Sequence, residues 1–279
     1  MSQGAITHHE FATSTCTGSM TDQGAQVISW APRGAAPVLY VSTAARFQQG
    51  SSIRAGAPIC WPWFGPGRFP GLTPAHGFVR VAAWELVSLQ ESADTVVTRH
   101  RVDSASVTSP VWPNPYAAEV VASFGAELSI ALTVTNTGTE ELDYEEAIHT
   151  YLAVGDVGEV LVAGLEGAPY IDKTTGGTRR VLEGLLAVTG ETDAVCETAD
   201  PITLVDPVLQ RRLVITLEGA KNAVVWNPWE AKGAALADVG EGEWRTFLCI
   251  EGANAFENAV RLAPGESHTL SYTVAVEPL

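Results

Sequence analysis

The sequence has few charged residues, and bases are scarcest of all. Only 17% of its 279 residues are charged while 46% are hydrophobic, a balance that excludes an intrinsically disordered chain. The 32 acidic residues outnumber the 16 basic ones, for a net charge of −16. This excess disfavours nucleic-acid binding, because it repels phosphate backbones over most of the surface. An anionic ligand would need a few basic side chains gathered at one place.

Cysteine is also scarce, and no two cysteines form a C-x-x-C pair. The four are Cys16, Cys60, Cys196 and Cys249. Their spacing excludes the common zinc and redox motifs, and we expect Cys60 and Cys249 to be buried free thiols among apolar neighbours. No apolar run approaches the roughly 20 residues that span a bilayer. Residues 1–9 lack the charged leader and apolar core of a signal peptide. We therefore predict a soluble, cytoplasmic protein with no membrane partner.

Alternation of apolar with small or polar residues recurs along the whole chain. In residues 128–135 it puts Leu128, Ile130 and Leu132 on one face, which is typical of a half-buried strand. Further strands are expected at 26–29, 38–41, 95–102, 119–124, 160–163, 213–217, 223–226, 246–250 and 270–276. No helix longer than two turns is expected. Many short strands separated by turn signals predict an all-β antiparallel sandwich or barrel, and no linker divides it, so residues 1–279 are predicted to form a single domain.

Residues 53–84 break the strand pattern. This segment holds five of the 16 prolines, five glycines, three tryptophans and three phenylalanines. Because proline fixes the backbone and removes a hydrogen-bond donor, the segment cannot be a central strand. We interpret it as a rigid, aromatic-lined loop, and long ordered loops are commonly functional. The alternative is an aromatic plug that seals one end of the sandwich.

Three ionisable residues stand where chemistry is expected. His76 lies at the exit of the rigid loop, His149 ends an apolar strand, and Glu251 directly follows the apolar residues 246–250. A carboxylate after a buried strand is costly unless it is paired or its pKa is raised, and a raised pKa suits a general acid or base at neutral pH. A structural role for each histidine and a solvent-exposed Glu251 remain the alternatives. Of the other histidines, His8 and His9 are expected in a mobile terminus, and His100 and His268 lie in polar strand patterns that show no partner.

A series of motifs spans residues 53 to 266. In order they are Ile53-Arg54-x-Gly-x-Pro58-Ile59-Cys60-x-Pro62-x-Phe64-Gly65, Ala75-His76-Gly77-Phe78-x-Arg80, Ala147-Ile148-His149-Thr150-Tyr151, Gly164-Leu165-Glu166-Gly167 with Tyr170-x-Asp172-Lys173, Gly190-Glu191-Thr192-Asp193, Val225-Trp226-Asn227-Pro228-Trp229, Ile250-Glu251 and Leu262-x-Pro264-Gly265-Glu266. Together they resemble the hexose-6-phosphate mutarotase (glucose-6-phosphate 1-epimerase) family, relatives of galactose mutarotase. The chain departs after Asp193, where the family usually shows Arg-Val-Tyr and this chain has Ala194-Val195-Cys196.

The resemblance implies a galactose-mutarotase-like antiparallel β supersandwich, in agreement with the strand pattern. It also implies interconversion of the α and β anomers of a sugar, most directly D-glucose 6-phosphate. A base takes the proton of the anomeric hydroxyl while an acid protonates the ring oxygen; the open aldehyde rotates and then recloses. This chemistry needs no metal, nucleotide or redox cofactor.

The resemblance also assigns roles to residues. It implies that Glu251 is the base, that His149 is the acid, and that His76 hydrogen-bonds the sugar near the ring oxygen. Asp193 would bind ring hydroxyls. Arg54 and Arg80 would hold the 6-phosphate through charge-assisted hydrogen bonds, with Arg68 of the same loop as a further candidate.

Two other functions compete with this hypothesis. An aldose 1-epimerase acting on unphosphorylated sugars would need His76, His149 and Glu251 but not the two arginines. A non-catalytic carbohydrate-binding protein could use the same sandwich without the acid or the base. In each case the expected partner is a small molecule, and we expect a monomer.

Overall fold

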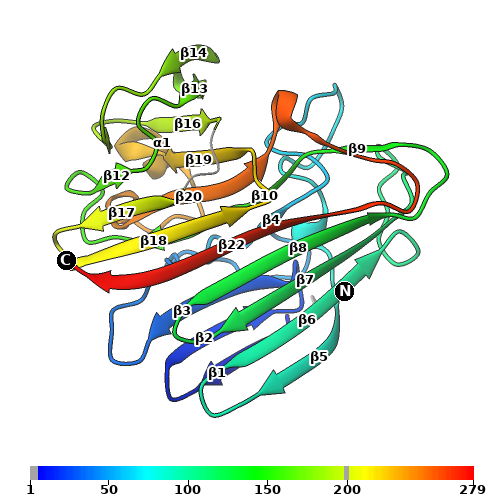
Figure 1. Ribbon diagram of the computed structural model, residues 1–279, viewed down its shortest axis with the longest axis horizontal. Helices are drawn as coiled ribbons and strands as arrows, with labels where there is room; N and C mark the ends of the chain where they lie inside the picture. The colour runs from blue at the N-terminus through cyan, green and yellow to red at the C-terminus, as the bar shows by residue number, and fades with distance from the viewer. Residues whose placement is uncertain (1–5, 198–200) are drawn as a thin grey trace.

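The computed structural model describes residues 6–197 and 201–279 as two large sheets, a small sheet and a two-stranded ribbon, all antiparallel (Figure 1). The nine-stranded sheet runs in the order β15 (Leu186–Ala187), β12 (Leu161–Ala163), β17 (Ile202–Asp206), β18 (Arg211–Glu218), β22 (Ser267–Pro278), β8 (Leu128–Asn136), β7 (Tyr116–Phe124), β6 (Val96–Asp103) and β5 (Glu85–Glu91). The eight-stranded sheet runs in the order β14 (Thr178–Val181), β13 (Pro169–Asp172), β16 (Thr192–Cys196), β19 (Asn222–Asn227), β20 (Phe247–Asn254), β10 (Glu146–Ile148) and β4 (Ile59–Cys60), and β11 (Tyr151–Ala153) also pairs with β20.

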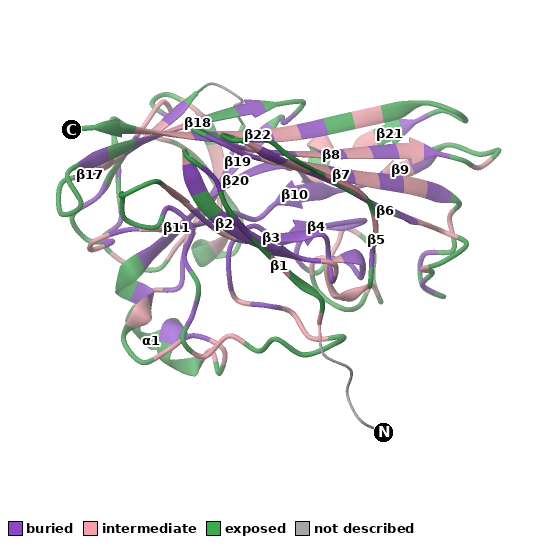
Figure 2. Ribbon diagram, turned by 90° about the horizontal axis from the view of Figure 1, so that it is seen from below, coloured by how far each residue is buried: buried purple, intermediate pink, exposed green. Residues whose placement is uncertain are grey.

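The remaining elements are short. The small sheet contains β1 (His8–Ala12), β2 (Cys16–Thr21) and β3 (Gln26–Pro32), and the ribbon pairs β9 (Leu142–Tyr144) with β21 (Val260–Leu262). One α-helix, α1 (Trp229–Ala235), lies on the opposite side of the molecule from β22 in Figure 2. The 3₁₀ turns are η1 (Val79–Val81), η2 (Lys173–Thr175), η3 (Glu243–Thr246) and η4 (Phe256–Asn258). No helix in the described ranges is both long and apolar enough to cross a bilayer.

The period-two pattern produces the core. Along β7 and β8 every second residue is fully buried and the residues between are half-exposed, the banding visible in Figure 2. The buried set packs Leu132 and Tyr272 of the nine-stranded sheet into the same cluster as Leu248 and Ile250 of β20. A fully buried aliphatic side chain contributes about 1.5–3 kcal/mol, so this shared core fixes which face of each strand remains for function.

The all-β antiparallel prediction is confirmed, and so are most of the predicted strands. The exception is 38–41, which makes only isolated bridges, Leu39 with Leu152 and Val41 with Ala55. These residues are apolar because they pack beside the eight-stranded sheet; Tyr40, for example, stacks on Phe247 with ring centroids 4.7 Å apart. Apolar content alone does not distinguish such a segment from a strand.

Residues 53–84 serve both of the purposes considered for them. Trp61 and Trp63 are fully buried and pack against Phe78 in the core, so part of the segment does plug the sandwich. Arg54 and His76, in contrast, line cavities outside the core. The only regular strand in the segment is β4, two residues at the edge of its sheet.

Candidate active site

The strand register brings His149 and Glu251 together. Ile148 pairs with Gly252 and Tyr151 pairs with Cys249, so the same register continued between them sets His149 opposite Glu251. Directly opposed residues on antiparallel strands share a face and lie about 5 Å apart at Cβ. The side chains meet with His149 Nε2 3.3 Å from Glu251 Oε1. Two residues about 100 positions apart in the sequence thus form one pair.

Neighbouring strands extend this face. Val224 of β19 lies opposite Glu251, and Trp226 lies opposite both Cys249 and Asp193 of β16. Because side chains alternate between the faces of a strand, these residues point away from the core that holds Ile250. They line a cavity of about 210 Å³ formed by Arg54, Phe64, His76, His149, Lys173, Asp193, Val224, Trp226, Lys232 and Glu251.

A second, smaller cavity adjoins the first. Its volume is about 110 Å³, and it shares Arg54, His76 and His149 with the larger one. Arg80 of η1, Tyr151 and Asp238 also line it. We call the two cavities together the cleft. All six site residues expected from the sequence line it: Arg54, His76, Arg80, His149, Asp193 and Glu251.

His76 is held as a neutral hydrogen-bond donor. The backbone N–H of Gly65 donates to His76 Nδ1 at 3.3 Å, which leaves the proton on Nε2. Burial, with help from the charge of Arg80, lowers the pKa of His76 to about 3. Its backbone is left-handed (φ 65°) and is followed by Gly77 (φ 75°), where a Cβ would lie 1.8 Å from the carbonyl oxygen of Trp61. Only glycine fits at 77, so the loop presents His76 in one orientation.

Burial governs the His149–Glu251 pair. It raises the pKa of Glu251 well above 4.5, an effect that the nearby Asp193 reinforces. It lowers the pKa of His149 well below 6.5, and His76 and Arg80 add to this. Both shifts favour the state in which the Glu251 carboxyl keeps its proton and the His149 imidazole is uncharged, so that the pair shares one titratable proton. Glu251 Oε2 and His149 Nδ1 are buried with no hydrogen-bond partner in the described residues, as expected of polar atoms that receive a ligand.

Aromatic and charged side chains complete the walls. His149 stacks on Tyr151 with ring centroids 4.8 Å apart, and Phe64 packs edge-on against His76. Asp193 forms an ion pair with Lys173, with Nζ 3.1 Å from Oδ2. The sugar-sized cavity is thus bounded by rings, which bury C–H faces, and by a carboxylate–ammonium pair that can accept from and donate to hydroxyl groups.

Arg68 does not line the cleft. It pairs with Asp143, and its Nε lies 3.7 Å from Glu145 Oε1. It borders a separate open groove of about 980 Å³ near Phe256. The loop turns Arg68 toward these two carboxylates and so leaves Arg54 and Arg80 as the arginines of the cleft.

Comparison with known proteins shows the family of this chain. Residues 9–275 match the family model described as aldose 1-epimerase. The chain belongs to the aldose 1-epimerase family. It is 35% identical over 237 residues to an Escherichia coli (strain K12) protein named "Putative glucose-6-phosphate 1-epimerase", covering 84% of this chain and 79% of the relative. It is 32% identical over 267 residues to a Cenchrus ciliaris protein of the same name, covering 90% of this chain and 78% of the relative.

Solved structures of aldose 1-epimerase relatives share the fold. The crystal structure of a "putative mutarotase (YeaD)" from Salmonella typhimurium superposes with a TM-score of 0.90 at 28% identity, covering 99% of this chain and 92% of the other. Galactose 1-epimerase from Lactobacillus acidophilus NCFM superposes with a TM-score of 0.73 at 9% identity, covering 99% of each chain. The galactose-mutarotase-like fold expected from the motifs is therefore confirmed.

Two clusters in the described residues gather metal-ligand atom types. One is His149, Cys249 and Glu251, with candidate ligand atoms within 4.8 Å of one another. Burial raises the pKa of Cys249 well above 9, which disfavours the thiolate that a metal would need. The other consists of His9, Asp22 and His100.

The mobile terminus expected for His8 and His9 is wrong, because both residues lie in β1, which pairs with β2. His9, His100 and His268 each have a carboxylate partner. Asp22 Oδ1 lies 2.7 Å from His9 Nε2 and 3.1 Å from His100 Nε2, so β1 is tied to β6 through one carboxylate. His268 Nε2 lies 3.1 Å from the buried Glu146. Neither contact lies in the cleft, and both link segments that are distant in sequence.

Sequence reasoning gave no role to several residues that line the cleft. Tyr151 could have been found by alternation, since it lies two positions from His149. Trp226 could not, because its place on the cleft face depends on the pairing of β19 with β20. Lys173 stands in a quoted motif, but its pairing with Asp193 depends on how η2 folds beside β16. Asp238 lies in a loop after α1, and nothing in its local sequence marks it.

Proposed function

We propose that this aldose 1-epimerase family member interconverts the α and β anomers of a hexose 6-phosphate, with D-glucose 6-phosphate as the expected substrate. One observation carries the proposal: an acid–base pair and two arginines line adjoining cavities of a single cleft. The larger cavity suits a pyranose ring, and the smaller one suits its anionic group. The names of the Escherichia coli and Cenchrus ciliaris relatives support the same substrate.

The single proton of the His149–Glu251 pair suffices for both halves of the reaction. For ring opening, ionised Glu251 takes the proton of the anomeric hydroxyl while protonated His149 gives one to the ring oxygen. Each of the two side chains is then uncharged, which is the state that burial favours. Ring closure on the other face of the aldehyde reverses both transfers and restores the first state. No proton is exchanged with solvent, and the 3.3 Å contact allows the pair to exchange its proton internally.

His76 and Asp193 position the sugar in this proposal. Neutral His76 offers its Nε2–H to an oxygen near the ring oxygen, because its Nδ1 is already engaged by Gly65. Asp193 and Lys173 face the same cavity and bind ring hydroxyls as acceptor and donor. Proper placement of the anomeric carbon against the pair contributes to rate as much as the proton transfers do.

Arg54 and Arg80 bind the phosphate. Their Nε atoms are buried and have no hydrogen-bond partner in the part of the chain that the structure describes. A buried N–H of a guanidinium without an acceptor is costly, and a phosphate oxygen would satisfy it. These two arginines are the local concentration of positive charge that an acidic protein needs in order to bind a dianion.

We place this activity in the cytoplasm and in a monomer. All four cysteines are buried free thiols, as expected for a protein of a reducing compartment. The cleft described above is built from side chains of one chain, so no second copy is needed to complete it.

The test is anomer-exchange NMR on a panel of sugars, each with and without the 6-phosphate. The proposal predicts fast exchange for D-glucose 6-phosphate and much slower exchange for free glucose. Equal rates on the two would instead indicate an aldose 1-epimerase for unphosphorylated sugars. Binding of sugars without any acceleration of exchange would indicate a carbohydrate-binding protein.

A further inference from the structure

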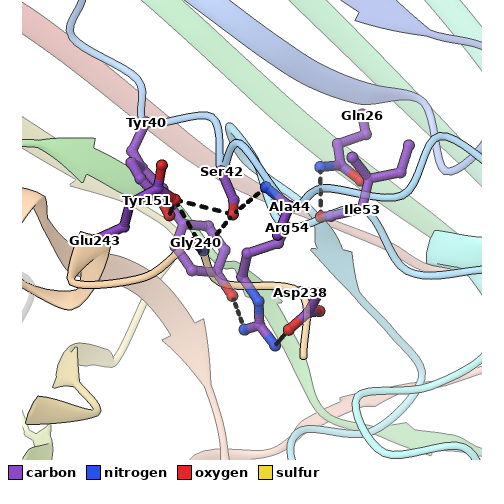
Figure 3. A network of polar contacts seen from close by, with 10 residues as sticks. All are labelled: Gln26, Tyr40, Ser42, Ala44, Ile53, Arg54, Tyr151, Asp238, Gly240 and Glu243. Carbon is purple, nitrogen blue, oxygen red and sulfur yellow. Dashed lines mark hydrogen bonds and ion pairs between the residues drawn. The ribbon is translucent and has the colours of Figure 1, made fainter. Parts of the chain in front are cut away.

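Arg54, one of the two phosphate-binding arginines, already has an anion beside it. Its Nη2 donates to Asp238 Oδ1 at 3.0 Å, and its Nη1 donates to the Tyr151 hydroxyl at 2.7 Å (Figure 3). Asp238 itself lines the smaller cavity. A carboxylate thus stands where a second anion must approach, and two anions at one guanidinium repel each other.

The backbone that carries Asp238 is fixed in place. Next to it, Val239 is buried in a cluster with Tyr40, Tyr151 and Phe247. The following residue, Gly240, donates its N–H to Glu243 Oε2 at 3.0 Å. The same oxygen accepts from the hydroxyls of Tyr40 at 2.6 Å and Ser42 at 3.1 Å. Figure 3 shows this network to the upper left of the Arg54–Asp238 contact. An arriving phosphate must therefore compete with the Asp238 side chain itself, because the loop is not free to carry it away.

Arg54 does not need Asp238 for its orientation. The guanidinium lies 5.7 Å from the ring centroid of Tyr151 and 6.0 Å from that of Trp226. With the Tyr151 hydrogen bond, these contacts hold the planar group from two sides. The carboxylate is thus an addition to a group that is already positioned, which favours competition over support as its role.

We propose that Asp238 is a specificity-determining residue that excludes small free anions, inorganic phosphate above all, from the phosphate site. The inference rests on the proposed function and deepens it. Inorganic phosphate could gain only contacts with the arginines, and Asp238 opposes these. A hexose 6-phosphate also gains the contacts of its ring in the larger cavity, and these offset the displacement of Asp238. Discrimination of this kind needs an element that acts against the wrong ligand.

The experiment is calorimetric titration of the folded chain with inorganic phosphate. We expect Asp238→Asn, which keeps the shape and removes the charge, to bind phosphate at least tenfold more tightly than the unmodified chain. Asp238→Ser should show the same gain, which guards against an effect peculiar to asparagine. In an Arg54→Ala background the gain from Asp238→Asn should disappear, since the competition is for that guanidinium.

Glu191→Gln is the matched control. Glu191 pairs with Lys232, another residue of the cleft wall, at 2.7 Å, so its substitution also removes one carboxylate from a cation of the cleft. We expect phosphate affinity within threefold of the unmodified chain. Unchanged or weaker binding by both Asp238 variants, or an equal gain in Glu191→Gln, would overturn the inference. Because the readout is binding, failure of the chain to exchange glucose 6-phosphate anomers would count against the proposed function and leave this result separate.

Discussion

At the scale of single residues, the proposed chemistry of the cleft depends on how burial changes the pKa values of Glu251 and His149. Burial raises the pKa of the Glu251 carboxyl and lowers the pKa of the His149 imidazole, so it favours the uncharged form of each group. Opposed shifts of this kind are how proteins prepare acid and base for work at one pH. The proposed chemistry needs both side chains, each in a different protonation state at each step.

Removing either member should therefore stop most of the catalysis. We expect Glu251→Gln and His149→Asn each to slow anomer exchange at least ~100-fold, the lower end for loss of a general acid or base. Exchange is measured by NMR at equilibrium with D-glucose 6-phosphate. Glu257→Gln, which alters an exposed carboxylate, is the control and should exchange at the unmodified rate. A pair variant that retains near-normal exchange would remove that residue from the mechanism.

Substitution of Arg54 or Arg80 should weaken the binding of phosphorylated substrates and leave unphosphorylated sugars little affected. Each charge-assisted hydrogen bond contributes about 1.5–3 kcal/mol, so Arg54→Ala and Arg80→Ala should each raise KM for glucose 6-phosphate roughly 10- to 150-fold. Rates with free glucose should change little. Arg68→Ala is the control from the same loop, because Arg68 lies outside the cleft. Equal losses on both sugars would show that the arginines do not read the phosphate.

The pH dependence of kcat follows from the directions of the two pKa shifts. The pair is active while it holds one proton. It gains a second proton only below the pKa of His149, which is well below 6.5, and loses its proton only above the pKa of Glu251, which is well above 4.5. Because the pKa of His149 lies well below 6.5, we expect kcat not to fall as the pH drops through 6.5. A loss of kcat toward acid with a midpoint near 6.5, the value of an ordinary histidine, would contradict the proposed environment of His149.

At the scale of elements, short irregular segments place the reactive groups on a regular frame. The residues His149 and Thr150 interrupt the strand between β10 and β11, yet the register against β20 is the same on both sides. The loop from 53 to 84 anchors itself with buried tryptophans and turns Arg54, His76 and Arg80 toward that frame. Rigid anchoring of this kind gives a loop the precision that a site needs.

Within this loop, a side chain at Gly77 would clash with the backbone of Trp61. Gly77→Ala would put a Cβ 1.8 Å from the Trp61 carbonyl oxygen, whereas Gly71 of the same loop, also left-handed at φ 86°, has no atom within 4 Å of that point. Both substitutions put alanine in a left-handed backbone conformation, which is strained, but only Gly77→Ala also creates a steric clash. We expect Gly77→Ala to lower the free energy of unfolding by about 1 to 3 kcal/mol more than Gly71→Ala does. Chemical denaturation measures the difference, and equal losses would contradict the close approach.

The sequence predicted which segments form strands better than it predicted which strands pair with each other. Alternation located β8, whose buried face repeats every second residue, and a continuous apolar run located β20, which is buried along its whole length. Motif positions located six residues that line the cleft. The sequence could not show that His149 faces Glu251, because register depends on pairing between distant segments. For the same reason the sequence could not identify Asp238 as a residue of the cleft. Its significance comes from Arg54, which lies nearly two hundred residues earlier in the chain.

At the scale of the whole molecule, an acidic protein concentrates positive charge at one face of one sheet. The net charge is −16, yet Arg54, Arg80, Lys173 and Lys232 all line the same cleft. Long-range repulsion is screened over roughly 8–10 Å at physiological salt, so these local cations decide what binds. The fold is shared with a galactose 1-epimerase from Lactobacillus acidophilus at only 9% identity, so the frame is compatible with wide changes in side chains.

The most direct test is a crystal structure with D-glucose 6-phosphate bound. The account predicts the pyranose in the larger cavity, with its anomeric hydroxyl and ring oxygen within hydrogen-bond reach of Glu251 and His149. The phosphate should lie in the smaller cavity, in contact with Arg54 and Arg80. A sugar phosphate bound elsewhere, for example with its phosphate at Arg68 in the open groove, and with the cleft empty, would contradict it.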